Sequence, residues 1–483
     1  MDYRDFLFEQ QHHTDQGKRS FLKKSLAFGL LGMSGIGSLS ALASAKSHIA
    51  LPNQGHYLIK NAHVIRMDGS QDDIGDVHVR DGIIISIGKN LQPTGAEIIE
   101  GEGMLALPGL VDTHWHIWTN LMRSMAGDRE GKGYFDITRM FGRHFTPDDM
   151  YQATRLATLE AIYSGITTVH DWSHNVRSLQ HAEGSLRALR ESGIRARYSC
   201  GAASGQDGEE PMDFQILSQL QQNWKTYDPE GLMQLGFAWR GMGDHPGIDS
   251  DESVGKQELE QARKMGIPVT VHASSPKILK GLADAGVMGK DMQIVHGMGA
   301  DFPEIKEMVA AGSSISISPF SELRIGYGFP PINKFVQSGA IIGLSIDTTT
   351  LSGNADMFAV MKVFLNTANA LARNEFELSA HQVLEMGTIG GAKSLGLERS
   401  IGTLEPGKQA DLILVNTRVP NIGVITNPVD LIVEAAQPSN VDMVMVAGRV
   451  LKRNGKLTDA NAEETYKSAT AAFKRLQEQV QKQ

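Results

Sequence analysis

Residues 105–398 alternate short apolar runs with longer amphipathic stretches, the pattern of a chain that switches between strands and helices. Thr146-Pro147-Asp148 predicts a helix start, because it supplies a capping hydroxyl and a proline in the first turn. The helix is expected to end at Ser164, since Gly165 and the apolar run 166–170 follow. Six further strands are predicted at residues 196–200, 234–239, 268–272, 293–296, 314–318 and 341–347. Together with a strand that opens at Leu110-Val111 and the strand at residues 166–170, they make eight β/α units. The pattern therefore predicts an α/β fold, a (β/α)8 TIM barrel.

Strand-rich segments flank this middle region on both sides. The predicted strands are residues 57–66, 77–80, 82–88, 410–416 and 441–448. We therefore expect a small composite β-sandwich domain formed by both chain ends. The predicted parts are a signal peptide (1–45), the N-terminal part of the sandwich (46–104), the barrel (105–398), the C-terminal part of the sandwich (399–455) and a C-terminal helix (456–483). The last is charged and is expected to pack on the outside of the barrel.

The first 45 residues read as an export signal. A basic cluster at residues 17–24 precedes a weakly apolar run from Ser25 to about Leu42, and Ala43-Ser44-Ala45 offers small residues to a signal peptidase. The cluster resembles a twin-arginine signal, although Lys18 stands where the first arginine should be. A periplasmic or secreted protein is expected, with no stable membrane insertion after cleavage. The alternative is an uncleaved membrane anchor. It is less favoured because the apolar run is short and glycine-rich for a helix that spans a membrane.

Composition narrows the range of partners. The chain has 41% hydrophobic and 21% charged residues, as soluble globular proteins do. Its formal net charge of -9 argues against nucleic acid or an anionic membrane as the main partner, so a small-molecule substrate is expected. Cys200 is the only cysteine, so any metal must be held by nitrogen and oxygen ligands. A homodimer is the default expectation for a soluble assembly.

Several predicted barrel strands finish in a polar side chain. His114 and His116 follow the opening apolar run, and alternate residues of a strand point the same way. Later strands end in His272, His296 and Asp347. The C-terminal ends of barrel strands meet at one face. Three nitrogens from His114, His116 and His272 and a carboxylate from Asp347 would hold one divalent metal, zinc first and ferrous iron as the alternative, with a position left for water.

Two longer motifs carry a family resemblance. They are Leu107-Pro108-Gly109-Leu110-Val111-Asp112-Thr113-His114-Trp115-His116 and the segment Ile401–Val415. Together with the terminal histidines and aspartate, they resemble the amidohydrolase superfamily, in the branch of the cytosine, methylthioadenosine/S-adenosylhomocysteine and triazine deaminases or chlorohydrolases. The resemblance implies a barrel with a composite sandwich and a single divalent metal. Strand 234–239 has no lysine that could become a bridging carbamate, which fits the one-metal branch.

The resemblance also implies roles for the strand-end residues. Asp347 would take a proton from a metal-activated water and deliver it to the leaving group. His296 would stabilise charge on the attacked oxygen or contact the substrate. The alternative is that His296 only supports the metal ligands.

One departure from the branch bears on the reaction. Its deaminases carry His-x-x-Glu on the fifth strand, where the glutamate protonates a ring nitrogen, whereas this chain reads His272-Ala273-Ser274-Ser275. A serine hydroxyl cannot replace that acid. Glu322 could supply it, or could be a solvated loop charge. The expected function is therefore exported, metal-dependent hydrolysis of a non-peptide carbon–nitrogen bond in a small cyclic or amide-bearing substrate. The alternatives are a deaminase or dehalogenating hydrolase of a nitrogen heterocycle and, more remotely, a catalytically silent binding protein.

Candidate substrate contacts come from the loops after the strands. The candidates are Trp118, His170, His174, Ser275 and Glu322. Trp115, Trp118, Tyr134 and Phe135 could form an apolar pocket wall or could equally be loop packing. Asp171 is expected to brace its loop.

Overall fold

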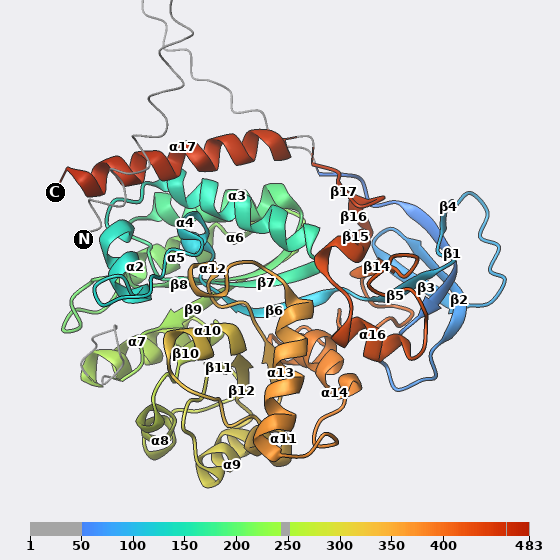
Figure 1. Ribbon diagram of the computed structural model, residues 1–483. Helices are drawn as coiled ribbons and strands as arrows, with labels where there is room; N and C mark the ends of the chain where they lie inside the picture. The colour runs from blue at the N-terminus through green and yellow to red at the C-terminus, as the bar shows by residue number, and fades with distance from the viewer. Residues whose placement is uncertain (1–50, 243–251, 460, 483) are drawn as a thin grey trace, which may run out of the picture.

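The computed structural model describes residues 51–242, 252–459 and 461–482. The predicted signal peptide lies outside the described residues. Two sheets organise the rest, an eight-stranded parallel sheet with helices around it and a nine-stranded sheet at one side of it (Figure 1). No described helix combines the length and the apolar character needed to cross a membrane.

The eight-stranded sheet forms the predicted barrel, with strands in the order β6 to β13. Its strands are β6 (Leu110–Trp115), β7 (Ile166–Ser173), β8 (Arg195–Gly201), β9 (Met233–Trp239), β10 (Val269–His272), β11 (Met292–Val295), β12 (Ser314–Ile317) and β13 (Ile342–Leu344). A bridge between Trp115 and Asp347 joins the two outer strands. The Asp347 N–H donates to the His114 carbonyl at 2.8 Å, and the His116 N–H donates to the Asp347 carbonyl at 2.6 Å. The barrel therefore closes at residues predicted to bind metal.

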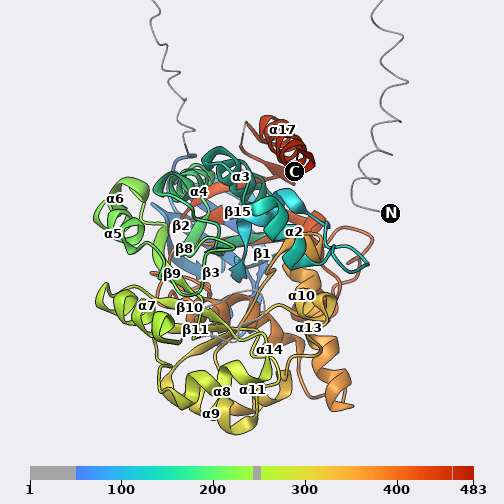
Figure 2. The same cartoon turned by 90° about the vertical axis from the view of Figure 1, so that its left-hand side faces the viewer.

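Helices surround the barrel, and Figure 2 shows α3 and α4 on one side and α8, α9 and α11 on the other. Helix α3 begins where predicted, because the Thr146 hydroxyl and the Asp149 carboxylate cap its first turn reciprocally. The helices through the barrel are η1 (Ile117–Met122), α2 (Tyr134–Gly142), α3 (Pro147–Tyr163), α4 (Leu179–Ser192), α5 (Phe214–Gln222), α6 (Trp224–Tyr227), α7 (Glu252–Lys264), α8 (Pro276–Asp284), α9 (Phe302–Ala311), α10 (Pro319–Ile325), α11 (Ile332–Ser338), α12 (Thr349–Ser352), α13 (Met357–Ala372), α14 (Ala380–Glu385), η2 (Met386–Gly390) and α15 (Gly391–Ser394).

The second sheet is built from both ends of the chain, as predicted. Its strands are β1 (His56–Val64), β2 (Asp73–Arg80), β3 (Ile83–Gly88), β4 (Glu97–Glu100), β5 (Met104–Pro108), β14 (Leu412–Asn416), β15 (Val441–Val446), β16 (Arg449–Arg453) and β17 (Lys456–Leu457), with α16 (Pro428–Glu434) and η3 (Pro438–Asn440) inserted. Strand β5 pairs with β14 from the far end of the chain and leads within two residues into β6. The link between the two sheets thus lies directly before His114 and His116, the first histidines predicted to bind metal.

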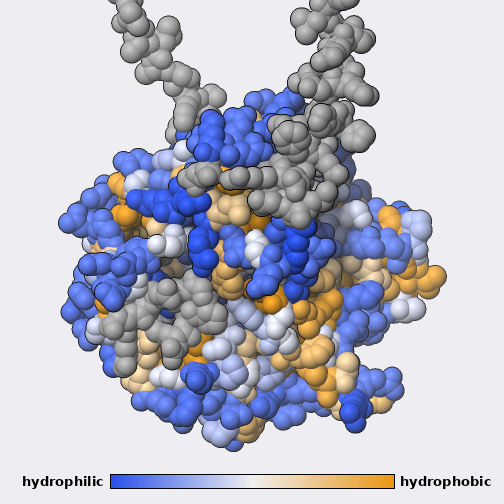
Figure 3. Space-filling view, turned by 60° about the vertical axis from the view of Figure 1, so that its left-hand side comes forward, coloured by the Kyte–Doolittle hydropathy of each residue, from blue (hydrophilic) through white to orange (hydrophobic). Residues whose placement is uncertain are grey.

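Helix α17 (Ala462–Gln481) lies within the segment predicted as the C-terminal helix, but it begins later than residue 456 because Lys456–Leu457 pair with β16 as β17. The helix lies across α3 on the outside of the barrel (Figure 1). Its Ala469, Ala472 and Leu476 pack against Phe141 and Met150. Arg475 forms an ion pair with Asp149. The space-filling view shows a largely hydrophilic face with smaller apolar areas between (Figure 3), in keeping with the composition.

A buried ion pair ties the barrel to the second sheet. Arg195, at the start of β8, donates from Nε to Asp411 Oδ2 at 2.8 Å and from Nη2 to Asp411 Oδ1 at 3.0 Å. The side chains are 4% and 1% exposed. The Ala447 N–H also donates to Asp411 at 2.8 Å. Removing the arginine would leave a buried carboxylate without its cation.

Arg195→Met is therefore expected to lower the free energy of unfolding by about 3 kcal/mol, measured by urea denaturation. The control is Arg418→Met. Arg418 pairs with Glu102 at 2.7 Å, but the side chains are 63% and 75% exposed. A loss below about 1 kcal/mol is expected there. Equal losses in the two variants would contradict the structural role of the Arg195 pair.

Candidate metal centre and active site

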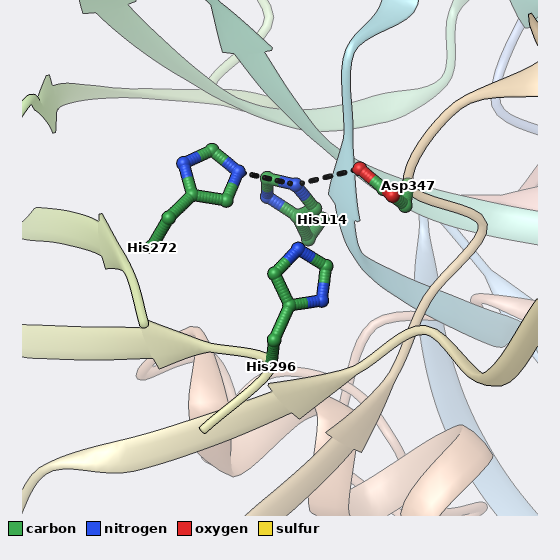
Figure 4. Close-up of side chains that lie close together, drawn as sticks. All are labelled: His114, His272, His296 and Asp347. Atoms are coloured by element: carbon green, nitrogen blue, oxygen red, sulfur yellow. Dashed lines mark hydrogen bonds and ion pairs between the residues drawn. The ribbon is translucent and has the colours of Figure 1, made fainter. Parts of the chain in front are cut away.

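Five predicted site residues meet at the C-terminal ends of the barrel strands. His114 lies in β6, His116 directly follows that strand, and His272 ends β10. His296 and Asp347 come just after β11 and β13. All five are buried. Figure 4 shows His114, His272, His296 and Asp347 directed toward one another.

The distances between their polar atoms are short. His114 Nε2 lies 3.1 Å from Asp347 Oδ1 and 3.2 Å from His272 Nε2. One ligand atom from each of the four residues in Figure 4 lies within 4.8 Å of the others. His116 Nε2 lies 3.4 Å from Asp347 Oδ1 and so contacts the same carboxylate. The predicted ligands are thus together, and His296 joins them.

These residues fit a divalent metal. Burial lowers the pKa of His114 and of His116 well below the ordinary value, so both imidazoles are neutral, the form that binds metals. Nε2 of His114, Nε2 of His272 and Oδ1 of Asp347 converge on one point. Neutral imidazoles and a carboxylate have few N–H or O–H groups to donate to one another, and a bound cation would satisfy their lone pairs. Nitrogen and oxygen donors of this kind suit zinc and ferrous iron.

The backbone is strained where the site is assembled. His296 and Asp347 have φ angles of 71° and 62°, in the left-handed region that side chains other than glycine seldom adopt. The positive φ of His296 directly follows the end of β11 at Val295, one residue before its predicted end, whereas β13 stops at Leu344, three residues before the predicted end at Asp347. Such strain persists where surrounding structure enforces it, and it is typical of functional sites.

Glu322 lies behind His296 rather than in the cavity. His296 Nδ1 is 3.0 Å from Glu322 Oε1, which also accepts from the Ser318 N–H at 2.9 Å. Glu322 is fully buried, so the alternative of a solvated loop charge is wrong, and it does not line the cavity as a substrate contact would. Burial alone would lower the pKa of His296, but the hydrogen bond to Glu322 and the charges of Asp347 and Glu322 outweigh it and raise that pKa. Glu322 therefore acts through His296.

The other predicted substrate contacts lie at different depths in the barrel, and only some of them reach the cavity. A cavity of about 690 Å³ opens above this group of histidines and Asp347, and His174 lines it. His170 does not line it. That histidine lies deeper, with Nδ1 2.9 Å from the Thr113 carbonyl and Nε2 2.8 Å from Ser199 Oγ. Trp118 is buried in loop packing and donates from Nε1 to His174 Nδ1 at 3.3 Å. Its role is to hold His174.

Ser275 also lies outside the cavity lining. It is half-buried at the N-cap position of α8 and makes no capping hydrogen bond with its side chain, while its neighbour Ser274 is buried and lines the cavity. Ser275 was the predicted substrate contact, but the serine that faces the cavity is Ser274.

The cavity walls contain residues that sequence reasoning did not assign. Trp172 lies over His272, with ring centroids 3.9 Å apart. Tyr134, Tyr327 and Arg240 also line the cavity. Tyr134 had been only a possible pocket wall. Arg240 directly follows the end of β9, and a polar residue at a strand end was the one signal that could have revealed it.

Arg240 is held rigidly at the cavity edge. Its guanidinium donates to Glu258 Oε1 at 2.6 Å, to the Glu210 carbonyl at 2.8 Å and to the Asp207 carbonyl at 3.0 Å. These bonds tie the loop after β8 to the cavity. That loop contributes the exposed carboxylates Asp207 and Glu209 to the lining.

The sequence matches the amidohydrolase family model over residues 105–451, and the chain belongs to that family. It is 29% identical to a 5-methylthioadenosine/S-adenosylhomocysteine deaminase of Moorella thermoacetica, over 86% of this chain and 98% of that protein. It is 28% identical to a 5'-deoxyadenosine deaminase of Methanobrevibacter smithii, over 87% and 98%.

Solved structures share the fold. An adenosine deaminase from Xanthomonas campestris with bound zinc superposes with a TM-score of 0.79 at 20% identity, covering 88% of this chain and 99% of that one. An atrazine chlorohydrolase from Arthrobacter aurescens in complex with zinc gives 0.75 at 21% identity, covering 86% and 100%. Family and site together define a hydrolase that acts on carbon–nitrogen bonds other than peptide bonds.

Proposed function

We propose that this enzyme hydrolyses an amide, lactam or carbamate bond of a small cyclic molecule, rather than removing an amino group from an aromatic ring. The observation that carries the proposal is the absence of a second buried carboxylic acid in the described cavity lining. Asp347 is the buried acid there, and Asp207 and Glu209 are exposed. Deamination of an aromatic ring requires a donor for the ring nitrogen.

The bound metal, proposed to be one zinc per chain, would polarise the scissile carbonyl and lower the pKa of water. His114, His116, His272 and Asp347 would hold it. Asp347 would accept the proton of the attacking water and pass it to the leaving nitrogen. His296, whose Nδ1 is held by Glu322, would donate from Nε2 to the developing oxyanion.

The cavity walls suit a small ring. Trp172, Tyr134 and Tyr327 offer flat surfaces to a planar molecule, and about 690 Å³ is ample for one. Arg240 and His174 add polar contacts near the opening. The pocket therefore favours a cyclic substrate with a polar substituent.

The second candidate is deamination or dehalogenation of a nitrogen heterocycle. The names of the related deaminases favour it. In this chain the ring nitrogen would then have to receive its proton from His296 or from an exposed carboxylate of the loop after β8.

Mass spectrometry of the products separates the two. The zinc-loaded enzyme is incubated in ¹⁸O-water with secondary lactams, cyclic ureides and carbamates, and in parallel with methylthioadenosine, cytosine and aminotriazines. We expect ring opening or bond cleavage to a labelled carboxylate or carbamate product without ammonia. The Asp347→Asn variant is the blank. Ammonia release from an aminated ring, with none of the first group turned over, would overturn the proposal.

Tyr134→Phe is expected to lower kcat by about 10²-fold with little change in KM. The Tyr134 side chain is buried and lines the cavity, and its ring lies 6.4 Å from that of His116. Its hydroxyl interacts with Thr348, and its place in the cavity wall also allows it to donate to a substrate atom. The control is Tyr198→Phe, because that hydroxyl is equally buried but outside the cavity lining. Equal effects in steady-state kinetics would contradict the assignment.

We also propose that the enzyme is exported. The support is the basic cluster, apolar run and small-residue site in residues 17–45. Fractionation of cells expressing the full chain is expected to yield a periplasmic form that begins at Lys46. A full-length cytoplasmic form alone would refute export.

A further inference from the structure

A second cavity opens at the other end of the barrel, where the strands begin. It has a volume of about 460 Å³ and includes the starting residues of β9, β11 and β12 and part of α15 in its lining. The catalytic residues described above lie where the strands end. The two cavities have no lining residue in common.

Arg197 forms the inner wall of this second cavity. It lies in β8 and is 6% exposed. Its Nη2 donates to Gln234 Oε1 at 3.1 Å and to the Leu395 carbonyl. Its Nε is buried without a hydrogen-bond partner among the described residues. The guanidinium is therefore anchored on one side and unsatisfied on another.

The charge of Arg197 has no carboxylate to balance it among the described residues. The other buried arginines there are paired, Arg155 with Asp459, Arg195 with Asp411 and Arg240 with Glu258. Arg197 forms no such ion pair in the described part of the chain. Burial lowers its pKa to about 10, which leaves it charged at neutral pH. A buried, unpaired cation is strongly unfavourable unless an anion neutralises it.

The mouth of the cavity is also positively charged. Lys290 and Lys393 line it, are exposed, and form no ion pair with any described residue. Asp291 lies in the lining too, but its carboxylate is taken by Arg263, at 2.8 and 3.2 Å. Three cations thus surround one opening in a chain whose net charge is -9.

We propose that this cavity binds a small organic anion through a phosphate or carboxylate group. Arg197 would neutralise the anionic group with its guanidinium, which suits phosphate and carboxylate oxygens. Lys290 and Lys393 would attract it at the mouth. Trp224, Met233 and Pro268 supply an apolar wall for the organic part. The site is separate from the catalytic cavity and does not depend on the proposed reaction.

Trp224 makes the site measurable. The metal-loaded enzyme is titrated at low ionic strength with inorganic phosphate and, separately, with succinate, and tryptophan fluorescence is recorded. We expect a saturable change that is absent in Trp224→Phe. If phosphate has the lower dissociation constant, the site prefers a phosphate group; if succinate has it, the site prefers a carboxylate. The double variant Lys290→Gln/Lys393→Gln should bind at least about tenfold more weakly, and Arg197→Gln should show no saturation.

The lysine variant keeps the test decisive if Arg197→Gln does not fold, because both lysines are exposed. Activity of the lysine variant should be unchanged. No saturable signal with either anion would overturn the proposal. Undiminished affinity in the lysine variant would overturn it as well, since it would place the anion elsewhere, for example on the catalytic metal.

Discussion

Asp347→Asn is expected to reduce kcat/KM by about 10³-fold in steady-state assays of the zinc-loaded enzyme. The carboxylate contacts His114 at 3.1 Å and His116 at 3.4 Å, and its backbone closes the barrel. Asparagine preserves the shape and the backbone bonds, but it cannot accept the proton of the attacking water. The loss should therefore appear in kcat, with an unchanged unfolding midpoint.

Asp171→Asn is the matched control. Asp171 is also buried beside β6, but it does not line the cavity. Burial raises its pKa to about 8, so its carboxyl is mostly protonated at neutral pH and an amide replaces it closely. A change of less than about threefold is expected at this position. A loss as large as that of Asp347→Asn would show that the effect comes from disturbed packing and not from proton transfer.

His272→Ala is expected to weaken zinc binding by more than about 10²-fold and to abolish activity at limiting zinc. Its Nε2 lies 3.2 Å from that of His114, so its loss removes a ligand from the centre of the group. Competition with a chromogenic chelator measures the change.

His181→Ala is the control for metal binding. His181 is 9% exposed and contacts Ser178 and the Phe145 carbonyl, outside the metal-binding group. The His181→Ala variant should bind zinc with the same affinity as the native enzyme. Equal affinity in the His272 and His181 variants would remove His272 from the ligand set.

The barrel and the metal-binding group could be predicted from the sequence because both follow from local pattern. Apolar runs of strand length between helical stretches gave all eight barrel strands, and their C-terminal ends must meet at one face. His114, His116, His272, His296 and Asp347 were therefore placed together before any distance was known.

The substrate contacts could not be predicted as well, because depth along the barrel axis is a tertiary property. His170 and Trp172 lie on β7 and His174 just beyond it, all spaced by two, but His170 lies in the interior, whereas Trp172 and His174 line the cavity. The sequence leaves Glu322 open between an acid at the substrate and a solvated loop charge, and only the fold brings it to His296. Loop residues such as Tyr134 depend likewise on how α2 packs over the strand ends.

Titration of activity with zinc tests the central assignment most directly. The metal-free enzyme receives increasing zinc, and both activity and bound zinc per chain are measured on the same samples. A linear rise in activity that levels off at one zinc per chain is expected. Activity that levels off only at two zinc ions per chain, or full activity without metal, would contradict a single metal held by His114, His116, His272 and Asp347.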